Sequence, residues 1–412
     1  MSEARLIDRR SVLQAAALGA SSLALAACGT PPGTVAPPMP TPTVGTSLPP
    51  PTASPSPTAT PTPTRAALRQ RIARLLVVGF RGLTVAENDP IARAIAEDGL
   101  GGVILFDRDE VLGVRNVKSP DQVAALVASL RALAPGRELI VAIDQEGGKV
   151  TRLSPKHGFP AVASEAAIGG RGDTAVQAWA EGIAGTLAGV GVNLNFAPVV
   201  DLNVNPANPA IGALDRAFSS DPAVVSRDAE IETTAHRDRG IRTALKHFPG
   251  LGSATANTDF GVADVTRTWR DRELDPYRDL LGLGLGLVDV IMAAHVVNGQ
   301  IDASAPASLS HRTVTGLLRG QLGWDGVVVT DDMGAAAIRQ AFGLREAIGL
   351  ALNAGNDLLL FANQHAYDAG LATNVLDIVE GLVGDGTVAE SRIDEAVARV
   401  TRLFDTPGAD PG

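Results

Sequence analysis

Reactive side chains stand directly after short apolar runs in this sequence. They are, in chain order, Asp144, Asp201, Lys246, His247, His295 and Asp331. Burying so many polar groups at the ends of apolar segments costs free energy, so a shared purpose is expected. Carboxylates and hydrogen-bond donors together suit acid/base and nucleophilic chemistry on a polyhydroxy substrate. The sequence therefore predicts an active site assembled from the ends of these runs.

Hydrolysis of a glycosidic bond with retention is one reaction that this equipment fits. It needs an ionised carboxylate as nucleophile and a proton donor about 5 Å away, and Asp331 can be the carboxylate. For Glu146 and Asp201 two interpretations stay open, a barrel-stabilising ion pair or a contact with the substrate. The six histidines are scattered and form no His-Glu-x-x-His, while no phosphate loop and no Gly-x-Ser-x-Gly elbow is present. We therefore expect neither a metal nor a cofactor.

The elements that must position these residues alternate between apolar runs and helical patterns. The runs cover residues 75–80, 102–106, 139–144, 193–197, 241–245, 288–293, 327–329 and 357–361. The helical patterns cover residues 90–97, 121–133, 174–187, 222–239, 269–282, 310–322, 344–354 and 367–383, with a last one at 390–404. Eight such pairs over roughly 340 residues predict an α/β fold, a single (β/α)₈ TIM barrel, with reactive residues at the C-terminal ends of its strands.

The fifth run leads into an irregular loop. We expect the strand 241–245 to end where Lys246-His247-Phe248-Pro249-Gly250 begins, because Pro249, Gly250 and Gly252 disfavour regular structure. The loop then reaches Asn257-Thr258-Asp259.

Several motifs in this order resemble glycoside hydrolase family 3, closest to its single-domain β-N-acetylhexosaminidase branch. They are Ile143-Asp144-Gln145-Glu146-Gly147-Gly148, Asn195-Phe196-Ala197-Pro198-Val199, Arg216-Ala217-Phe218, Lys246-His247-Phe248-Pro249-Gly250, Met292-Ala293-Ala294-His295, Pro306-Ala307-Ser308-Leu309-Ser310 and Gly326-Val327-Val328-Val329-Thr330-Asp331-Asp332-Met333. The resemblance spans essentially all of the part that we expect to fold.

Carried over by position, the resemblance implies the roles of the site residues. Asp331 would be the nucleophile, and Asp332 would support it. The substrate-binding residues would be Asp144 and Arg152 at the sugar hydroxyls, Arg216, Lys246 and His247 around the sugar that is cleaved off, and His295 nearby. The chemistry agrees, because a carboxylate accepts from a diol and Lys or Arg donates to hydroxyls or to an acetamido carbonyl.

The acid/base is where this chain departs from the family pattern. The branch usually reads Lys-His-Phe-Pro-Gly-His-Gly and then Asp-Ser-His, whose last His is the acid/base, whereas this chain has Leu251 and then Asn257-Thr258-Asp259. Asp259 stands at the His position and would be a carboxylic acid donor if burial or the anionic nucleophile raised its pKa. The other interpretation is that Asp259 only braces the loop.

The N-terminal residues do not look like folded domain. Residues 1–28 carry Asp8-Arg9-Arg10, an Ala-rich apolar run and Leu25-Ala26-Ala27-Cys28, which resembles an export signal with a lipobox, with Arg9-Arg10 similar to a twin-arginine signal. Lipidation of Cys28, the single Cys, would anchor the protein to the outer face of the cytoplasmic membrane or to the cell envelope. Residues 29–64 are a Pro/Thr-rich linker that could hold the domain, residues 65–412, on the order of 100 Å from the lipid.

Charge and composition narrow the partners. The 412 residues carry a net charge of −10 without a Lys/Arg cluster, which argues against nucleic acid as a partner. The expected partners are a carbohydrate, with an N-acetylglucosaminide as the first choice, and the membrane through the lipid. The expected function is that of an exported retaining β-N-acetylhexosaminidase. Three alternatives stay open: another exo-β-glycosidase, a glycoside phosphorylase of the same fold, and a sugar-binding lipoprotein that has lost its acid.

Overall fold

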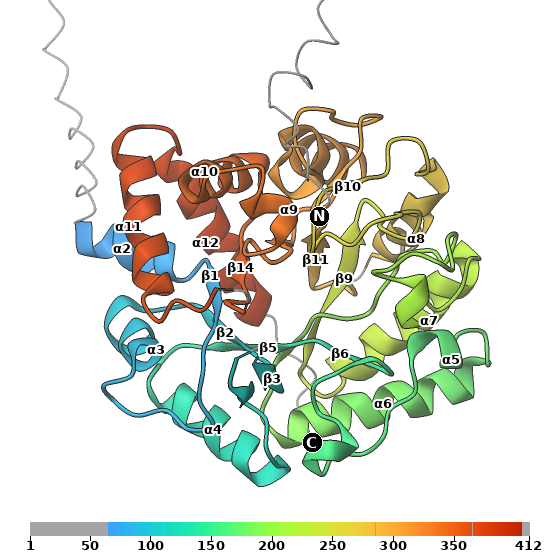
Figure 1. Cartoon of the computed structure of the whole chain (residues 1–412), viewed down its shortest axis with the longest axis horizontal. Helices are drawn as coiled ribbons and strands as arrows, with labels where there is room; N and C mark the ends of the chain where they lie inside the picture. Colours follow the sequence, from blue (N-terminus) through green and yellow to red (C-terminus); the bar gives the residue numbers. More distant parts are fainter. Residues whose placement is uncertain (1–64, 110, 285, 365, 406–412) are drawn as a thin grey trace, which may run out of the picture. The chain divides into compact units, whose positions relative to one another are not determined.

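Eight parallel strands surround the centre of the domain (Figure 1). They are β1 (Leu76–Gly79), β2 (Gly102–Leu105), β5 (Ile140–Ile143), β8 (Leu194–Asn195), β9 (Arg242–Phe248), β11 (Val290–Ala293), β13 (Val327–Thr330) and β14 (Leu359–Phe361). Neighbours in the sheet follow the chain order, β14 pairs with β1, and a bridge between Val329 and Leu358 joins β13 to β14. The predicted (β/α)₈ barrel is confirmed.

The computed structural model describes residues 65–109, 111–284, 286–364 and 366–405, which belong to one compact unit. The predictions for residues 1–64, Cys28 included, lie outside the described residues. Within the described ranges, no helix has both the length and the apolar character that crossing a membrane requires.

Helices cover the outside of the barrel. They are α2 (Arg65–Ala73), α3 (Pro90–Arg93), η2 (Ala94–Asp98), α4 (Pro120–Ala132), η3 (Pro155–His157), α5 (Glu165–Ile168), α6 (Asp173–Gly189), η4 (Gly212–Leu214), α7 (Pro222–Arg237), η5 (Asp271–Leu274), α8 (Asp275–Gly282), η6 (Ala307–Leu309), η7 (Arg312–Gln321), α9 (Ala336–Arg339), α10 (Leu344–Ala354), α11 (Leu371–Gly384) and α12 (Glu390–Asp405). The sequence at the starts of α4 and α7 explains why these helices begin where they do. Ser119 and Asp221 cap them by accepting from the N–H groups of Gln122 and Ala223, with a proline at the first helical position.

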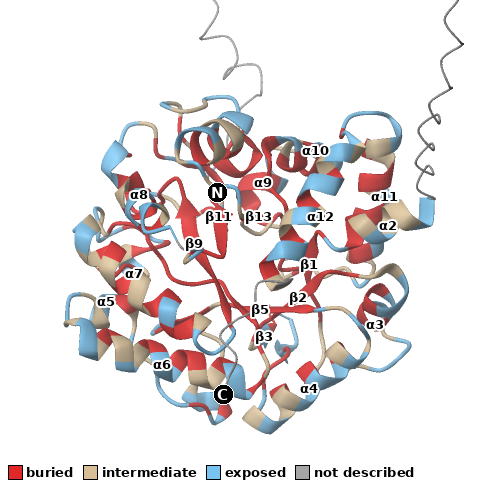
Figure 2. Cartoon of the chain, turned by 180° about the vertical axis from the view of Figure 1, so that it is seen from behind, coloured by how far each residue is buried: buried red, intermediate tan, exposed pale blue. Residues whose placement is uncertain are grey.

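The barrel strands are buried on both faces, and Figure 2 shows them in red, the colour of buried residues. Their runs of Val, Ile, Leu and Ala pack against the helices outside and against one another inside. This explains why they read as continuous apolar runs without alternation.

Three short strand pairs lie at the end of the barrel where the barrel strands end. β3 (Arg108–Asp109) pairs with β4 (Gly113–Val114), β6 (Gln145–Gly147) with β7 (Val150–Thr151), and β10 (Ala263–Asp264) with β12 (Val296–Val297). Each pair starts after a barrel strand, so these segments and the loops between them build the rim of the C-terminal face.

The strand β9 is longer than the sequence predicts. We expected it to end at Leu245, but it continues to Phe248 and therefore contains Lys246 and His247. Pairing with neighbours carries it on: Val199 bridges to Lys246, and Ala293 of β11 pairs with Phe248 after a shift in register. The two residues thus belong to the barrel wall and not to a loop.

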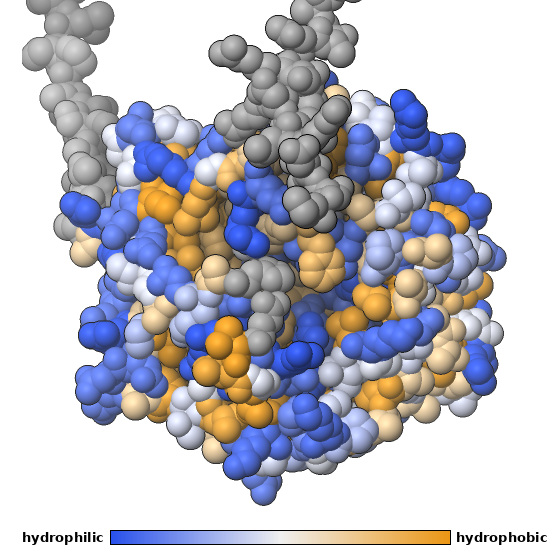
Figure 3. Space-filling model, in the orientation of Figure 1, coloured by the Kyte–Doolittle hydropathy of each residue, from blue (hydrophilic) through white to orange (hydrophobic). Residues whose placement is uncertain are grey.

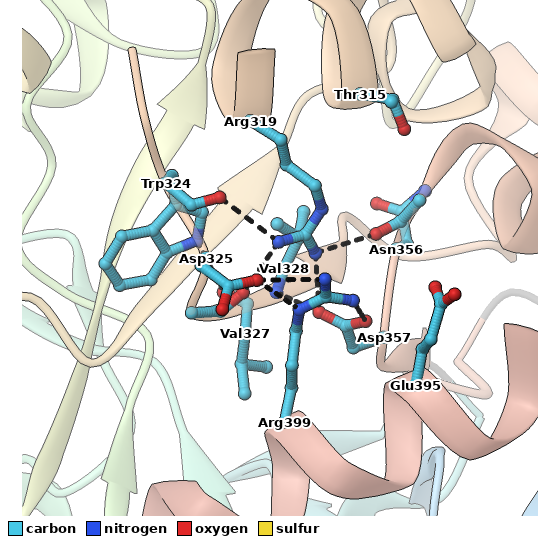
Figure 4. Close-up of polar contacts among 12 residues, drawn as sticks. Thr315, Arg319, Trp324, Asp325, Val327, Val328, Asn356, Asp357, Glu395 and Arg399 are labelled. Carbon is cyan, nitrogen blue, oxygen red and sulfur yellow. Dashed lines mark hydrogen bonds and ion pairs between the residues drawn. The ribbon is translucent and has the colours of Figure 1, made fainter.

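A group of ion pairs, here called the seam cluster (Arg319, Asp325, Asp357, Arg392 and Arg399), lies where β13 and β14 begin, at the opposite end of the barrel. Figure 4 shows Arg319, Asp325, Asp357 and Arg399 of this cluster pointing toward one another. Asp357 is fully buried just before β14, and it accepts from Arg319 at 2.7 Å, Arg392 at 2.5 Å and Arg399 at 3.4 Å. It also accepts from the N–H of Val328 in β13 at 3.0 Å. The cluster therefore ties helices η7 and α12 to the seam where β13 and β14 close the barrel.

Candidate active site

A cavity of about 320 Å³ opens at the C-terminal ends of the strands. Seven of the predicted site residues line it: Asp144, Arg152, Arg216, Lys246, His247, Asp259 and Asp331. They come from segments that follow or end β5, β8, β9 and β13, far apart in sequence. Figure 3 shows this end of the molecule, with hydrophilic and hydrophobic residues mixed around a central hollow.

Glu146 holds two cations at the base of the cavity. Its carboxylate accepts from Arg216 Nε at 2.7 Å and Nη2 at 2.8 Å, and Lys246 Nζ lies 2.5 Å away. Burial opposes ionisation of Glu146, yet the charges of Arg216 and Lys246 hold its pKa well below the ordinary value. Glu146 is therefore an ion-pair partner that fixes Arg216 and Lys246, the first of the two roles considered from the sequence, and it also lines the cavity.

Asp144 faces the cavity between two donors. Lys246 Nζ lies 3.0 Å from its Oδ1, and Arg152 Nη2 lies 3.4 Å from its Oδ2. Although burial opposes it, the charges of Lys246 and Arg152 lower the pKa of Asp144. Burial likewise opposes the charge of Lys246, but Glu146 and Asp144 raise its pKa. The result is an ionised, pre-oriented set of acceptors and donors that suits sugar hydroxyls.

His247 is oriented by Asp201. Its Nδ1 lies 2.6 Å from Asp201 Oδ2, and its Nε2 lies 3.3 Å from Arg216 Nη2. A guanidinium only donates, so Nε2 accepts and Nδ1 carries the hydrogen that Asp201 receives. Asp201 is buried, accepts also from the N–H of Leu251, and is not among the residues lining the cavity. It positions His247 from outside the cavity lining.

Asp331 lies at the end of β13 and opens into the cavity. Its N–H donates to Ala293 O at 3.0 Å, and its Oδ1 accepts from the N–H of Asp332 at 2.8 Å. Asp332 Oδ1 in turn accepts from the N–H groups of Gly334 and Ala362. This agrees with the supporting role expected of Asp332, and burial raises the pKa of its carboxyl.

His295 is the predicted site residue that the structure does not bring into the cavity. It is buried, its Nε2 donates to the carbonyl of Asp332 at 2.8 Å, and its Nδ1 lies 2.6 Å from Ser308 Oγ. It therefore touches the backbone beside Asp331 from behind. His295 therefore lies close to the site but outside the lining of the cavity.

Asp259 lines the cavity but is exposed. It does not have the burial that the sequence-based expectation of a proton donor invoked. Its place is nevertheless fixed by backbone hydrogen bonds: Ala336 and Ala337, at the start of α9, donate to the carbonyls of Asp259 and Thr258 at 3.3 and 3.1 Å. Since α9 follows β13, the loop is held on the segment that carries Asp331.

Three buried carboxyl groups near the cavity form no ion pair with any cation in the described part of the chain. Glu165 and Glu232 are fully buried, and burial raises both pKa values well above the ordinary range. The charge of Glu232 adds to the shift of Glu165, and that of Glu146 to the shift of Glu232. Burial also raises the pKa of Glu273 to about 7, while hydrogen bonds from Ser253 oppose the shift. Burial therefore favours the neutral form of all three acids.

Other lining residues were not foreseen from the sequence. Phe106 follows β2 and has the Arg152 guanidinium 5.2 Å above its ring, Phe260 follows Asp259, and Gln364 follows β14. Only their position directly after apolar runs or motifs could have signalled them.

Comparison with known proteins adds to this geometry. The model of the glycosyl hydrolase family 3 N-terminal domain matches residues 67–403. The chain is 35% identical over 351 residues to a beta-hexosaminidase of Xanthomonas euvesicatoria, covering 81% of this chain and 97% of the relative. The chain therefore belongs to glycoside hydrolase family 3, and it is a glycoside hydrolase.

Solved structures agree in fold. A beta-N-acetylhexosaminidase from Beutenbergia cavernae matches with a TM-score of 0.73 and 33% identity, over 82% of this chain and 98% of the other. A family 3 beta-N-acetylglucosaminidase from Paenibacillus sp. matches with a TM-score of 0.74 and 34% identity, over 84% of this chain. This chain spans 64% of that longer protein.

Proposed function

We propose that this protein is a retaining β-N-acetylglucosaminidase that removes terminal N-acetylglucosamine from glycans, with fragments of cell-wall glycan as the expected source. The observation that carries the proposal is the cavity in which Asp331 meets the donor and acceptor set of Asp144, Arg216 and Lys246. The names of the hexosaminidase relatives support the choice of sugar.

In this mechanism Asp331 attacks the anomeric carbon while a proton is delivered to the glycosidic oxygen, and the aglycone leaves as an alcohol. The covalent glycosyl–Asp331 ester is then cleaved by water that gives up a proton, which regenerates the free carboxylate and the sugar. Asp144, Arg152, Arg216, Lys246 and His247 hold the sugar. Asp259 is the proposed acid in the first step and base in the second.

A leaving-group series tests the enzyme and its acid together. The purified domain should hydrolyse aryl N-acetyl-β-glucosaminides, and Asp331→Ala should not. Asp259→Ala should slow substrates with poor leaving groups far more than those with good ones, and azide should restore its turnover. An equal loss on all substrates without azide rescue, together with the leaving-group pattern in His247→Ala, would refute the assignment of Asp259.

Added phosphate separates hydrolysis from phosphorolysis. A hydrolase should give free sugar at a rate independent of phosphate. Formation of a sugar 1-phosphate, or binding of disaccharides without turnover, would replace the proposal by one of the alternatives.

We also propose that the protein is exported and anchored by a lipid on Cys28. The support is the Leu-Ala-Ala-Cys sequence and the Pro/Thr-rich segment after it. Mass spectrometry of the N-terminal peptide from a native host should show a diacylated Cys28, and Cys28→Ala should release the protein from the membrane fraction. An unmodified N-terminus that includes residues 1–27 would contradict this.

A further inference from the structure

One aromatic side chain is exposed at the edge of the cavity. The side chain of Phe260 is 75% exposed and lines the cavity. It is the single aromatic residue among the strongly exposed large hydrophobic residues of the described part of the chain. Such exposure loses the free energy that burial of a phenyl ring would contribute, so it suggests a partner that covers the ring.

The backbone holds Phe260 in place. The N–H groups of Phe260 and Gly261 donate to the carbonyl of Asn257 at 3.1 and 3.2 Å, and the side chain of Asn257 accepts from Asp259 N–H at 2.9 Å. Thr258 is buried, and the loop is bonded to the start of α9 as described above. The ring is therefore presented by a turn with internal hydrogen bonds and a fixed attachment.

The cavity is divided by chemistry. Its base carries Asp144, Glu146, Arg216 and Lys246, which are buried or half-buried and suit the hydroxyls of one sugar. Phe260 adjoins Asp259, the proposed proton donor, and a donor must contact the oxygen that joins the cleaved sugar to its leaving group. The residue next to the donor is thus expected on the leaving-group side of the bond.

We propose that Phe260 is the platform on which the leaving-group sugar ring stacks, so that the preferred substrate is a disaccharide or longer glycan. The C–H face of a pyranose is apolar and rigid, and it covers a phenyl ring at little cost in conformational freedom. This inference rests on the proposed function, since it assigns Phe260 a role in the same reaction. Phe260 thereby determines specificity for the aglycone.

The test compares three substrates with the same N-acetylglucosaminyl group: a β-1,4-linked disaccharide, a hexyl glycoside and the glycosyl fluoride. Phe260→Ala should lower kcat/KM for the disaccharide about tenfold, the hexyl glycoside less, and the fluoride not at all, because fluoride has nothing to stack. Phe260→Tyr keeps the ring and should retain wild-type values. Val262→Ala removes a neighbouring exposed side chain outside the cavity lining and should change none of the three.

The outcomes separate this inference from the proposed function. A wild-type protein that cleaves all three substrates, with Phe260→Ala unchanged on the disaccharide, overturns the role of Phe260 alone. A greater loss on the hexyl glycoside than on the disaccharide does the same, because it would show a general apolar patch. A wild-type protein inert on the fluoride overturns the proposed function itself. Thermal melting of each variant confirms that the fold is intact.

Discussion

The two ends of the barrel carry charged clusters of similar composition and opposite character. At the seam, Asp357 is fully buried, and three arginines and a backbone N–H satisfy it. At the other end, Asp331 opens into a cavity, and Asp144 turns one face to the same space. A closed cluster whose buried carboxylate is already paired offers no accessible group to a ligand, while an open one can exchange its partners for those of a substrate. Access, more than charge, distinguishes the two.

The two ends of the barrel also differ in how far their buried carboxylates are paired with cations. Cations outnumber carboxylates at the seam, whereas Glu165, Glu232 and Glu273 lie buried near the cavity and form no ion pair with any cation that the structure describes. Of these acids Glu273, with a pKa raised to about 7, changes its charge near neutrality.

The largest expected effect is a loss of catalytic activity that leaves the stability of the fold unchanged. Asp331→Asn removes the nucleophile and should lower kcat about 10⁴-fold or more, while the melting temperature stays within a degree or two of the wild type. Steady-state kinetics and calorimetry measure the two. A large loss of stability in this variant would mean that Asp331, like Asp357, mainly supports the fold.

The converse is expected at the seam. Asp357→Asn leaves Arg319, Arg392 and Arg399 without their buried anion and should cost about 3–5 kcal/mol of unfolding free energy. Activity per folded molecule should be unchanged. Asp325→Asn, in the same cluster but 77% exposed, is the matched control and should cost well under about 1 kcal/mol. Urea titrations monitored by fluorescence measure both, and equal costs would deny that burial sets the difference.

Glu146 should combine both classes, because it is buried like Asp357 yet fixes cavity residues. Glu146→Gln weakens its bonds to Arg216 and Lys246, so we expect a loss of about 2–3 kcal/mol in stability and a loss of about 100-fold in kcat/KM. If only stability or only kcat/KM changes, Glu146 has a purely structural or a purely functional role.

The smallest effect concerns pH. The pKa of Glu273 is raised to about 7, so the folded state holds this proton more tightly than the unfolded state does. The resulting stabilisation is complete below about pH 4.5 and is lost as pH rises to about 7. Glu273→Gln is neutral throughout and should flatten the fall in melting temperature across this range by a few degrees. Glu97→Gln, an exposed substitution, should follow the wild type.

The barrel was predictable because most of the buried strands are continuous apolar runs and because helices such as α4 and α7 begin with a capping residue and a proline. The predicted end of β9 was wrong by three residues. The strand continues because Lys246 bridges to Val199 and Phe248 pairs with Ala293 of β11, and no local pattern reveals such pairing. Helix α11 likewise begins at Leu371 and not at 367.

The site was predictable as a set of residues but not as a network. Sequence placed Asp144, Lys246 and Asp331 at strand ends, and the structure brings them together. It could not show that Glu146 bridges Arg216 and Lys246, that Asp201 orients His247, or that His295 stays behind the cavity. Those facts depend on side-chain directions between segments distant in sequence. The catalytic roles of Asp331 and Asp259 stay predictions.

The attachment of the 257–261 loop to α9 has a consequence for how this family can change. The position of the proposed proton donor is set by the carbonyl groups of Thr258 and Asp259, which accept from the N–H groups of Ala337 and Ala336, and any amino acid possesses those carbonyl groups. One donor type can then replace another without moving the point from which the proton is delivered. If Asp259 is the donor, its carboxyl group, at the position where the family resemblance places an imidazole, would be such a replacement: the backbone fixes the position, and the side chain can change.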